Sequence, residues 1–223
     1  VGTAVRNNAG TLTSAKTGEL FYDSTALDFV YRFPNKTSAG TWRTGANMNT
    51  ARAYNFATAG VQTAALNYGG NEPPGAVTGK TESYDGSTWT EVADLNDTRG
   101  GNAGAGTYTA AISTGGSSPG DTANTETWNG SSWTEVNNLG QARNRLAAVG
   151  LVTAALAYGG YGAPYYALTE SWNGTSWSEV ADLNTARNQL GGAGIQTAAL
   201  AFGGAPGPTG ATESWNGSAW TEV

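Results

Sequence analysis

The chain has 223 residues and a formal net charge of −6, with 33 glycines, 8 tryptophans and 10 tyrosines, but no cysteine or histidine. The missing residues exclude disulfides, thiolate nucleophiles and the commonest general base and transition-metal ligand. The acidic balance argues against nucleic acid or an anionic membrane as a partner, and no apolar run is long enough to cross a membrane. We therefore expect no cofactor, no metal site and no membrane insertion.

The first 44 residues lack two markers that recur at fixed positions in the rest of the chain, the repeat arginine and the diglycine. They match the rest in two other places. Tyr22–Asp23 parallels Tyr84–Asp85, and Trp42 lies 47 residues before Trp89. We interpret residues 1–44 as a divergent copy of the unit that follows. The alternative is a connecting stem.

Four near copies of one unit follow, and each contains a segment close to Thr-Glu-Ser-Trp-Asn-Gly-Ser-x-Trp-Thr-Glu-Val. The second tryptophan of this segment recurs in steps of 44, 44 and 43 residues, at Trp89, Trp133, Trp177 and Trp220. A diglycine recurs at a corresponding position in each unit, at residues 69–70, 115–116, 159–160 and 203–204, and an arginine marks each unit, at Arg52, Arg99, Arg143 and Arg187. A regular period of this length indicates a repeat architecture.

Each unit predicts four short antiparallel strands, named a to d here. In the third unit, strand a covers residues 144–150, and strand b is the apolar run 152–158 that ends in the diglycine. Strand c is Thr169–Trp172, and strand d starts near Trp177. An Asn-Gly or Asp-Gly dipeptide joins c to d, and such dipeptides favour two-residue hairpin turns. Four antiparallel strands per unit are typical of a propeller blade.

The units resemble kelch repeats. The resemblance covers residues 47–223 and rests on the diglycine after strand b, the tryptophan on strand d and an aromatic residue on strand c, at Tyr84, Trp128, Trp172 and Trp215. It implies an all-β fold, a β-propeller of four-stranded antiparallel blades that forms a single domain over residues 1–223. With the divergent copy we predict five blades, bounded approximately by residues 1–44, 45–92, 93–136, 137–180 and 181–223.

The units are also similar to repeats in tail-fibre and other virion proteins of marine bacteriophages. That resemblance implies a virion or extracellular location. It also implies other virion subunits as possible partners.

A glutamate on strand c predicts an ion pair in every unit. Glu126, Trp128 and Trp133 project to one face of the c–d hairpin, and a carboxylate between tryptophans needs a partner. The arginine before strand a supplies one, which gives the pairs Arg52–Glu82, Arg99–Glu126, Arg143–Glu170 and Arg187–Glu213. We favour a structural role, because a catalytic residue is normally unique. The alternative is a ring of arginines that binds an anionic ligand.

The tryptophans allow two interpretations as well. They either pack between blades or stack on sugar rings, and we favour packing because they recur at fixed positions.

The b–c loops differ between units, and function on a rigid scaffold usually lies on such loops. The third loop carries Tyr161, Tyr165 and Tyr166, which suggest a contact patch for a sugar or a protein. Asn71 and Glu72 of the first loop are further candidate ligand-binding residues.

No catalytic set emerges from the sequence, so we expect a non-catalytic recognition module and not an enzyme. It would bind a cell-surface glycan or protein through the face that carries the b–c loops. One alternative is a purely structural propeller within a virion or fibre. The other is a glycosidase-like enzyme with two carboxylates about 5–10 Å apart, drawn from Asp28, Glu72, Asp97 and Asp121.

Overall fold

The computed structural model describes residues 6–7, 20–23, 28–31, 44–54, 57–207 and 209–223. The regular elements in these residues are all strands, and no helix long and apolar enough to cross a membrane is found among them. Contacts divide the chain into two compact units, Val1–Thr44 and Gly45–Val223, where the sequence led us to expect one domain.

The described part of the first unit is a three-stranded sheet of β1 (Arg6–Asn7), β2 (Leu20–Asp23) and β3 (Asp28–Tyr31). β1 pairs with β2 in parallel, and β2 pairs with β3 antiparallel. A parallel pair differs from the antiparallel blade that we expected here. Trp42 lies outside the described residues, and the divergent-blade interpretation stays a prediction.

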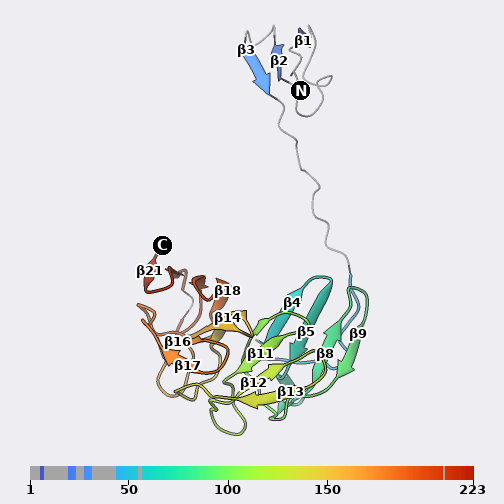
Figure 1. Ribbon diagram of the computed structural model, residues 1–223, viewed down its shortest axis with the longest axis vertical. Helices are drawn as coiled ribbons and strands as arrows, with labels where there is room; N and C mark the ends of the chain where they lie inside the picture. The colour runs from blue at the N-terminus through green and yellow to red at the C-terminus, as the bar shows by residue number, and fades with distance from the viewer. Residues whose placement is uncertain (1–5, 8–19, 24–27, 32–43, 55–56, 208) are drawn as a thin grey trace. The chain divides into compact units, whose positions relative to one another are not determined.

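The second unit contains four sheets of four antiparallel strands, one for each repeat of the sequence (Figure 1). The first sheet is β4 (Thr58–Val61), β5 (Ala64–Tyr68), β8 (Thr81–Tyr84) and β9 (Trp89–Val92). The second is β10 (Ala103–Gly106), β11 (Ala111–Thr114), β12 (Thr125–Trp128) and β13 (Trp133–Val136). The third is β14 (Ala147–Leu151), β15 (Ala154–Tyr158), β16 (Thr169–Trp172) and β17 (Trp177–Glu179). The fourth is β18 (Gly191–Ile195), β19 (Ala198–Phe202), β20 (Thr212–Trp215) and β21 (Trp220–Glu222). A small two-stranded sheet, β6 (Asn71–Glu72) and β7 (Ala76–Val77), lies in the b–c loop of the first.

Strand b lies inside each sheet and is covered on both faces where a sheet has two neighbours. In β15 the residues Ala155, Leu156, Ala157 and Tyr158 are all fully buried. This explains why strand b is a continuous apolar run instead of an alternating one.

The hairpin between strands a and b requires glycine at a fixed place. Gly150 has φ +108°, and a Cβ added there would lie 2.4 Å from the carbonyl oxygen of Ala154. Only glycine avoids both the strained φ and this overlap. Gly60, Gly106 and Gly194 occupy the same place with φ between +105° and +121°.

The c–d turns are longer than we predicted. Trp128 pairs directly with Trp133, so residues 129–132 form a four-residue loop and not a two-residue turn. The Asn129 side chain accepts the backbone N–H of Ser131 and Ser132, which stabilises the longer loop. The strand faces still come out as expected, because lengthening a loop by two residues keeps the same side chains on the same face.

The four sheets form an open array. The first strands of successive sheets contact each other, β4 with β10, β10 with β14 and β14 with β18, and apolar clusters fill the spaces between neighbouring sheets. No closed ring is found in the part of the chain that the structure describes. Contacts assign residues 1–44 to a separate compact unit, and the count of five blades stays a prediction.

Candidate functional site

Each sheet contains a buried ion pair between an arginine and a glutamate. The nitrogen–oxygen distances are 2.6 Å for Arg52–Glu82, 2.8 Å for Arg99–Glu126, 2.6 Å for Arg143–Glu170 and 3.0 Å for Arg187–Glu213. No side chain in these pairs is more than 6% exposed. Each guanidinium is therefore neutralised inside its own sheet, which disfavours a ring of arginines that binds an anionic ligand.

The glutamate carboxylates also accept hydrogen bonds from the backbone of the segment that leads into each repeat. Glu82 accepts the backbone N–H of Asn49 and Thr50, and Glu126 accepts those of Asn96 and Asp97. Burial alone would raise the pKa of Glu82, but these N–H groups and the Arg52 guanidinium outweigh burial and hold the pKa below its ordinary value. The ion pairs are thus structural junctions between strand c and the incoming chain.

The third sheet departs from this pattern. The residue that precedes each repeat arginine by three is Asn49, Asn96 or Asn184 in the other sheets, and its side-chain amide donates to the carbonyl oxygen of the strand-d tryptophan. The third sheet has Gly140 there, so this bond is missing. A pocket of about 280 Å³ lies at this point, lined by Gly140, Glu170 and Trp177 among others. Arg143 Nη2 is also buried without a hydrogen-bond partner.

The tryptophans on strands c and d pack between sheets. Trp128, Trp133, Trp172, Trp215 and Trp220 are at most 5% exposed, and the two tryptophans of each hairpin lie with ring centroids 5.3 to 5.5 Å apart. Buried rings cannot stack on a sugar, so the geometry favours the packing interpretation for these five.

One face of the second unit carries a row of residues that the sequence analysis missed. The residue two positions after each repeat arginine has a left-handed φ, namely Tyr54 at 49°, Gly101 at 67°, Arg145 at 54° and Gln189 at 53°. Backbone hydrogen bonds link these residues across the sheets, from Gly101 N to Tyr54 O (3.1 Å), Arg145 N to Gly101 O (2.6 Å) and Gln189 N to Arg145 O (2.8 Å). We call this row the belt.

The belt adjoins the b–c loops. The residue before each belt position bridges to the first residue after the diglycine, as in Ala53 with Asn71 and Asn144 with Tyr161. The belt and the b–c loops together are called the b–c face below. A non-glycine residue with positive φ is uncommon, and the spacing of two from each arginine was the signal that could have identified the row.

The belt places a cation beside an aromatic ring. The guanidinium carbon of Arg145 lies 5.6 Å from the ring centroid of Tyr54, which is 56% exposed. Among the described residues of Gly45–Val223, Arg145 is the one Lys or Arg without an ion pair. This guanidinium is therefore available for a ligand.

The b–c loop of the third sheet presents two tyrosines. Tyr161 pairs with Tyr165 across the loop, and the two ring centroids are 5.2 Å apart in an edge-on arrangement. Tyr165 is 37% exposed. Tyr166 is half-buried and lies over Gly162, where an added Cβ would be 2.6 Å from its ring. Tyr165 is thus the most exposed of the three tyrosines, Tyr161 lies against it, and Tyr166 packs within the loop on Gly162.

Asn71 and Glu72 lie in the b–c loop of the first sheet and interact within that loop. The Asn71 amide donates to Gly75 O, and Glu72 forms an ion pair with Lys80 at 3.3 Å. A hydrogen bond from Thr78 is the largest influence on Glu72 and lowers its pKa. The structure brings Tyr161, Tyr165 and Tyr166 together on the third sheet, two sheets along the array from Asn71 and Glu72.

The candidate carboxylates of a glycosidase each have a different neighbour. Asp97 accepts a hydrogen bond from Asn124, Asp121 accepts one from Asn144, and Glu72 is paired with Lys80. The side chain of Asp28 lies outside the described residues. Among the residues that the structure describes, no cluster of three acidic side chains that could hold a metal ion is present.

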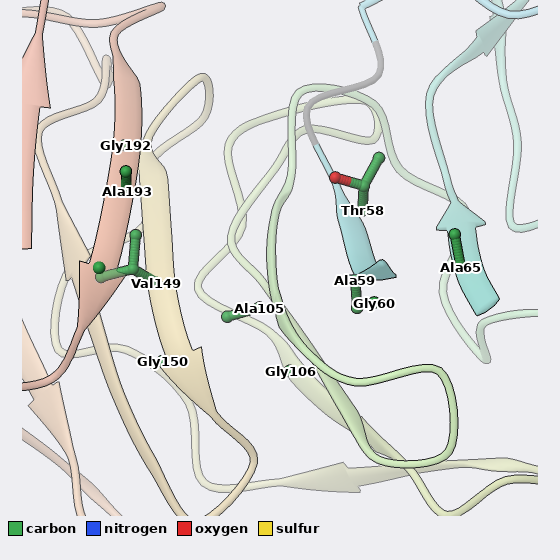
Figure 2. A pocket seen from close by; sticks show the side chains of 11 residues that line it. Thr58, Ala59, Gly60, Ala65, Ala105, Gly106, Val149, Gly150, Gly192 and Ala193 are labelled. Atoms are coloured by element: carbon green, nitrogen blue, oxygen red, sulfur yellow. The ribbon is translucent and has the colours of Figure 1, made fainter. Parts of the chain in front are cut away.

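The first strands of the four sheets surround a central pocket of about 320 Å³ (Figure 2). Its lining consists of small residues from β4, β10, β14 and β18 together with Ala65 of β5. The only side chains in the lining larger than alanine are those of Thr58 and Val149. None of the lining side chains is titratable. The pocket can accept a small molecule or water, but it offers no acid or base.

Comparison with known proteins does not add a family to these observations. No protein-family model matches the chain, and no curated protein is significantly similar to it.

Proposed function

We propose that the second unit is a β-propeller-type module of kelch-like repeats that recognises a cell-surface glycan or protein without catalysis. The observation that carries the proposal is the pair of the half-buried Tyr161 and the exposed Tyr165, whose rings meet edge-on and whose backbones form a bridge. Tyrosine has few rotatable bonds, so little entropy is lost when a ligand packs on a ring that is already fixed.

The belt extends the surface next to this patch. Asn144, which bridges to Tyr161, directly precedes Arg145 in the chain. Tyr54 then lies against Arg145. Aromatic rings beside an unpaired guanidinium suit a ligand with an apolar sugar face and a polar or anionic substituent.

The buried groups of the repeats support a scaffold role for the rest of the unit. The arginines, glutamates and tryptophans that recur in each copy are used for packing and pairing inside the sheets. Side chains that differ between copies, such as Tyr54, Arg145 and Tyr165, are left at the surface of the b–c face. We further propose a virion or another extracellular assembly as the location.

A glycan array probed with the full chain tests the proposal. We expect selective binding, and we expect Tyr165→Ala and Tyr54→Ala each to weaken it at least about tenfold, which corresponds to about 1.4 kcal/mol. Tyr165→Phe should retain most of the binding, because stacking needs the ring and not the hydroxyl.

Val61→Ala is the matched control. Val61 is 67% exposed and lies at the a–b turn, at the end of its strand remote from the b–c loops. It should bind like the unchanged chain. The absence of selective binding to any glycan would contradict glycan recognition, and equal losses for Val61→Ala and Tyr165→Ala would contradict the assignment of the face.

A further inference from the structure

Neighbouring sheets in the second unit are joined by the same hydrogen bonds at all three interfaces. The strand-d tryptophan of one sheet donates from Nε1 to the strand-c threonine of the preceding sheet, from Trp133 to Thr81 at 3.0 Å, from Trp177 to Thr125 at 3.2 Å and from Trp220 to Thr169 at 3.0 Å. The second glycine of each diglycine donates to the carbonyl of the next repeat arginine, from Gly70 to Arg99, Gly116 to Arg143 and Gly160 to Arg187, each at 2.9 Å. The belt bonds are the third set.

The first and fourth sheets carry the donor and acceptor groups that would form these bonds with a further sheet. On the fourth sheet, the Thr212 hydroxyl, the Gly204 N–H and the Gln189 carbonyl are the counterparts of groups that are paired at the interfaces. On the first sheet, the counterparts are Trp89 Nε1, the Arg52 carbonyl and the Tyr54 N–H. None of these six groups has a hydrogen-bond partner among the described residues.

Apolar side chains are uncovered on the same face of the fourth sheet. Leu200 is 42% exposed, whereas its counterparts Leu66, Ile112 and Leu156 are at most 1% exposed. Phe202 is also 42% exposed, whereas Tyr68 and Tyr158 at the same position are fully buried. A pocket of about 400 Å³ lies there, lined by Leu200 and Trp215 among others.

The first sheet exposes the face that, in the other three sheets, is covered by the preceding sheet. Ala65 is half-buried, whereas its counterparts Ala111, Ala155 and Ala199 are at most 5% exposed. Tyr84 is likewise half-buried, while Trp128, Trp172 and Trp215 at its position are at most 4% exposed. The face that would receive Leu200 is therefore present on the first sheet of the same chain.

We propose that a second copy of this chain packs its first sheet on the fourth sheet of the first copy. The contact would reproduce the three internal interfaces, with Trp89 Nε1 of one copy donating to Thr212 Oγ1 of the other, Gly204 N–H to the Arg52 carbonyl and Tyr54 N–H to the Gln189 carbonyl. The three internal copies of the interface identify the occupant, because the same residue types meet there with the same bonds. The contact is head to tail, so each copy uses two different faces.

Sedimentation of the full chain over about 1–300 µM tests the proposal. We expect reversible association, and we expect Leu200→Arg and Ala65→Arg each to weaken it at least about a hundredfold, because a charge buried without a partner opposes binding. Leu151→Arg is the matched control. Leu151 is 49% exposed on an inner sheet, and Val61 and Ile195 at its position are exposed as well, so its exposure does not reflect a missing neighbour.

Mixing the two variants separates this contact from a symmetric one. A head-to-tail contact predicts that Leu200→Arg and Ala65→Arg are each monomeric alone but form a one-to-one pair when mixed, since one good face of each kind remains. If Ala65→Arg still associates alone, the contact is not head to tail and the proposal is wrong.

A monomer at every concentration would also overturn the proposal. Hydrogen exchange then identifies the reason. The Gly204 N–H has no partner among the described residues, so protection of this amide in the monomer would show that residues 1–44 cover the fourth sheet. Rapid exchange of this amide would show that nothing does. Far-UV circular dichroism and urea unfolding confirm that each variant is folded. The two proposals share the Tyr54 backbone, but Tyr165→Ala tests glycan binding alone, and Leu200→Arg and Ala65→Arg test association alone, so either proposal can fail without the other.

Discussion

At the scale of single residues, the buried ion pairs show what the repeated charges do. Burying an arginine and a glutamate costs several kcal/mol each, and the cost is recovered only when the pair satisfies further hydrogen bonds. Here the glutamates accept backbone N–H groups, and Arg99 Nη1 donates to the Asn124 carbonyl. Burial is also the main reason that the pKa of Arg99 lies below its ordinary value.

Gly140→Asn should stabilise the chain. The asparagine would supply the amide that Asn96 and Asn184 provide in their own sheets, one bond to the glutamate and one to the tryptophan carbonyl. We expect a gain of about 1 kcal/mol in the free energy of unfolding, measured by urea denaturation. The reverse change, Asn96→Gly, is the matched control and should lose a similar amount. A destabilised Gly140→Asn variant would contradict the role given to this position.

Glu82 should make stability dependent on acid pH. Its pKa is lowered in the folded chain, so the folded state binds the proton less readily than the unfolded state does. The stabilisation is present above the ordinary pKa of 4.5 and is lost as the pH falls through the lower pKa of the folded state. Unfolding free energies measured from about pH 6 to pH 2 should therefore fall less steeply in Glu82→Gln than in the unchanged chain. Identical slopes would contradict the assignment.

At the scale of elements, the interfaces between sheets explain the two tryptophans of the repeat. The strand-d ring fills the space between sheets and its N–H reaches a threonine that is fully buried, as Trp133 does with Thr81. A phenylalanine would fill part of this space but could not donate the hydrogen bond.

Trp133→Phe should thus be much more damaging than Trp89→Phe. We expect a loss of about 2 kcal/mol for Trp133→Phe, from the hydrogen bond and the space left behind. Trp89 is half-buried and has no such acceptor among the described residues of its own chain, so the same change should cost less than about 0.5 kcal/mol. Thermal unfolding in dilute solution, where copies do not associate, measures both. Equal losses would indicate that the bond to threonine contributes nothing.

The sequence predicts these elements well for residues that recur at the same position in every repeat. Glutamate, arginine and the two aromatics recur together, so their positions on strands and their pairing follow from alternation. The length of the c–d loop did not follow, because Asn129 accepts two N–H groups and an Asn-Gly dipeptide serves a four-residue loop as well as a two-residue turn. The left-handed backbone of Tyr54, Arg145 and Gln189 was also missed, since their side chains share no pattern.

At the scale of the whole molecule, the sequence could not predict whether the array closes. The repeat determines how one sheet packs on the next. Closure of the ring depends on the number of sheets and on the angle by which each sheet is rotated relative to its neighbour. Residues 1–44 have the length of one repeat and form a compact unit of their own. Within the second unit, the exposed Leu200 and Phe202 mark the fourth sheet as an end of the array.

The repetition of one interface has a consequence for how the array loses its structure. Each sheet touches only its neighbours, so the free energy of the array is close to a sum of sheet terms and nearest-neighbour terms, as in a one-dimensional Ising chain. The two inner sheets are held by two coupling terms each and the outer two by one. Disorder should therefore enter from the ends and advance sheet by sheet, and each repeat added to such an array contributes one more coupling term without changing the others.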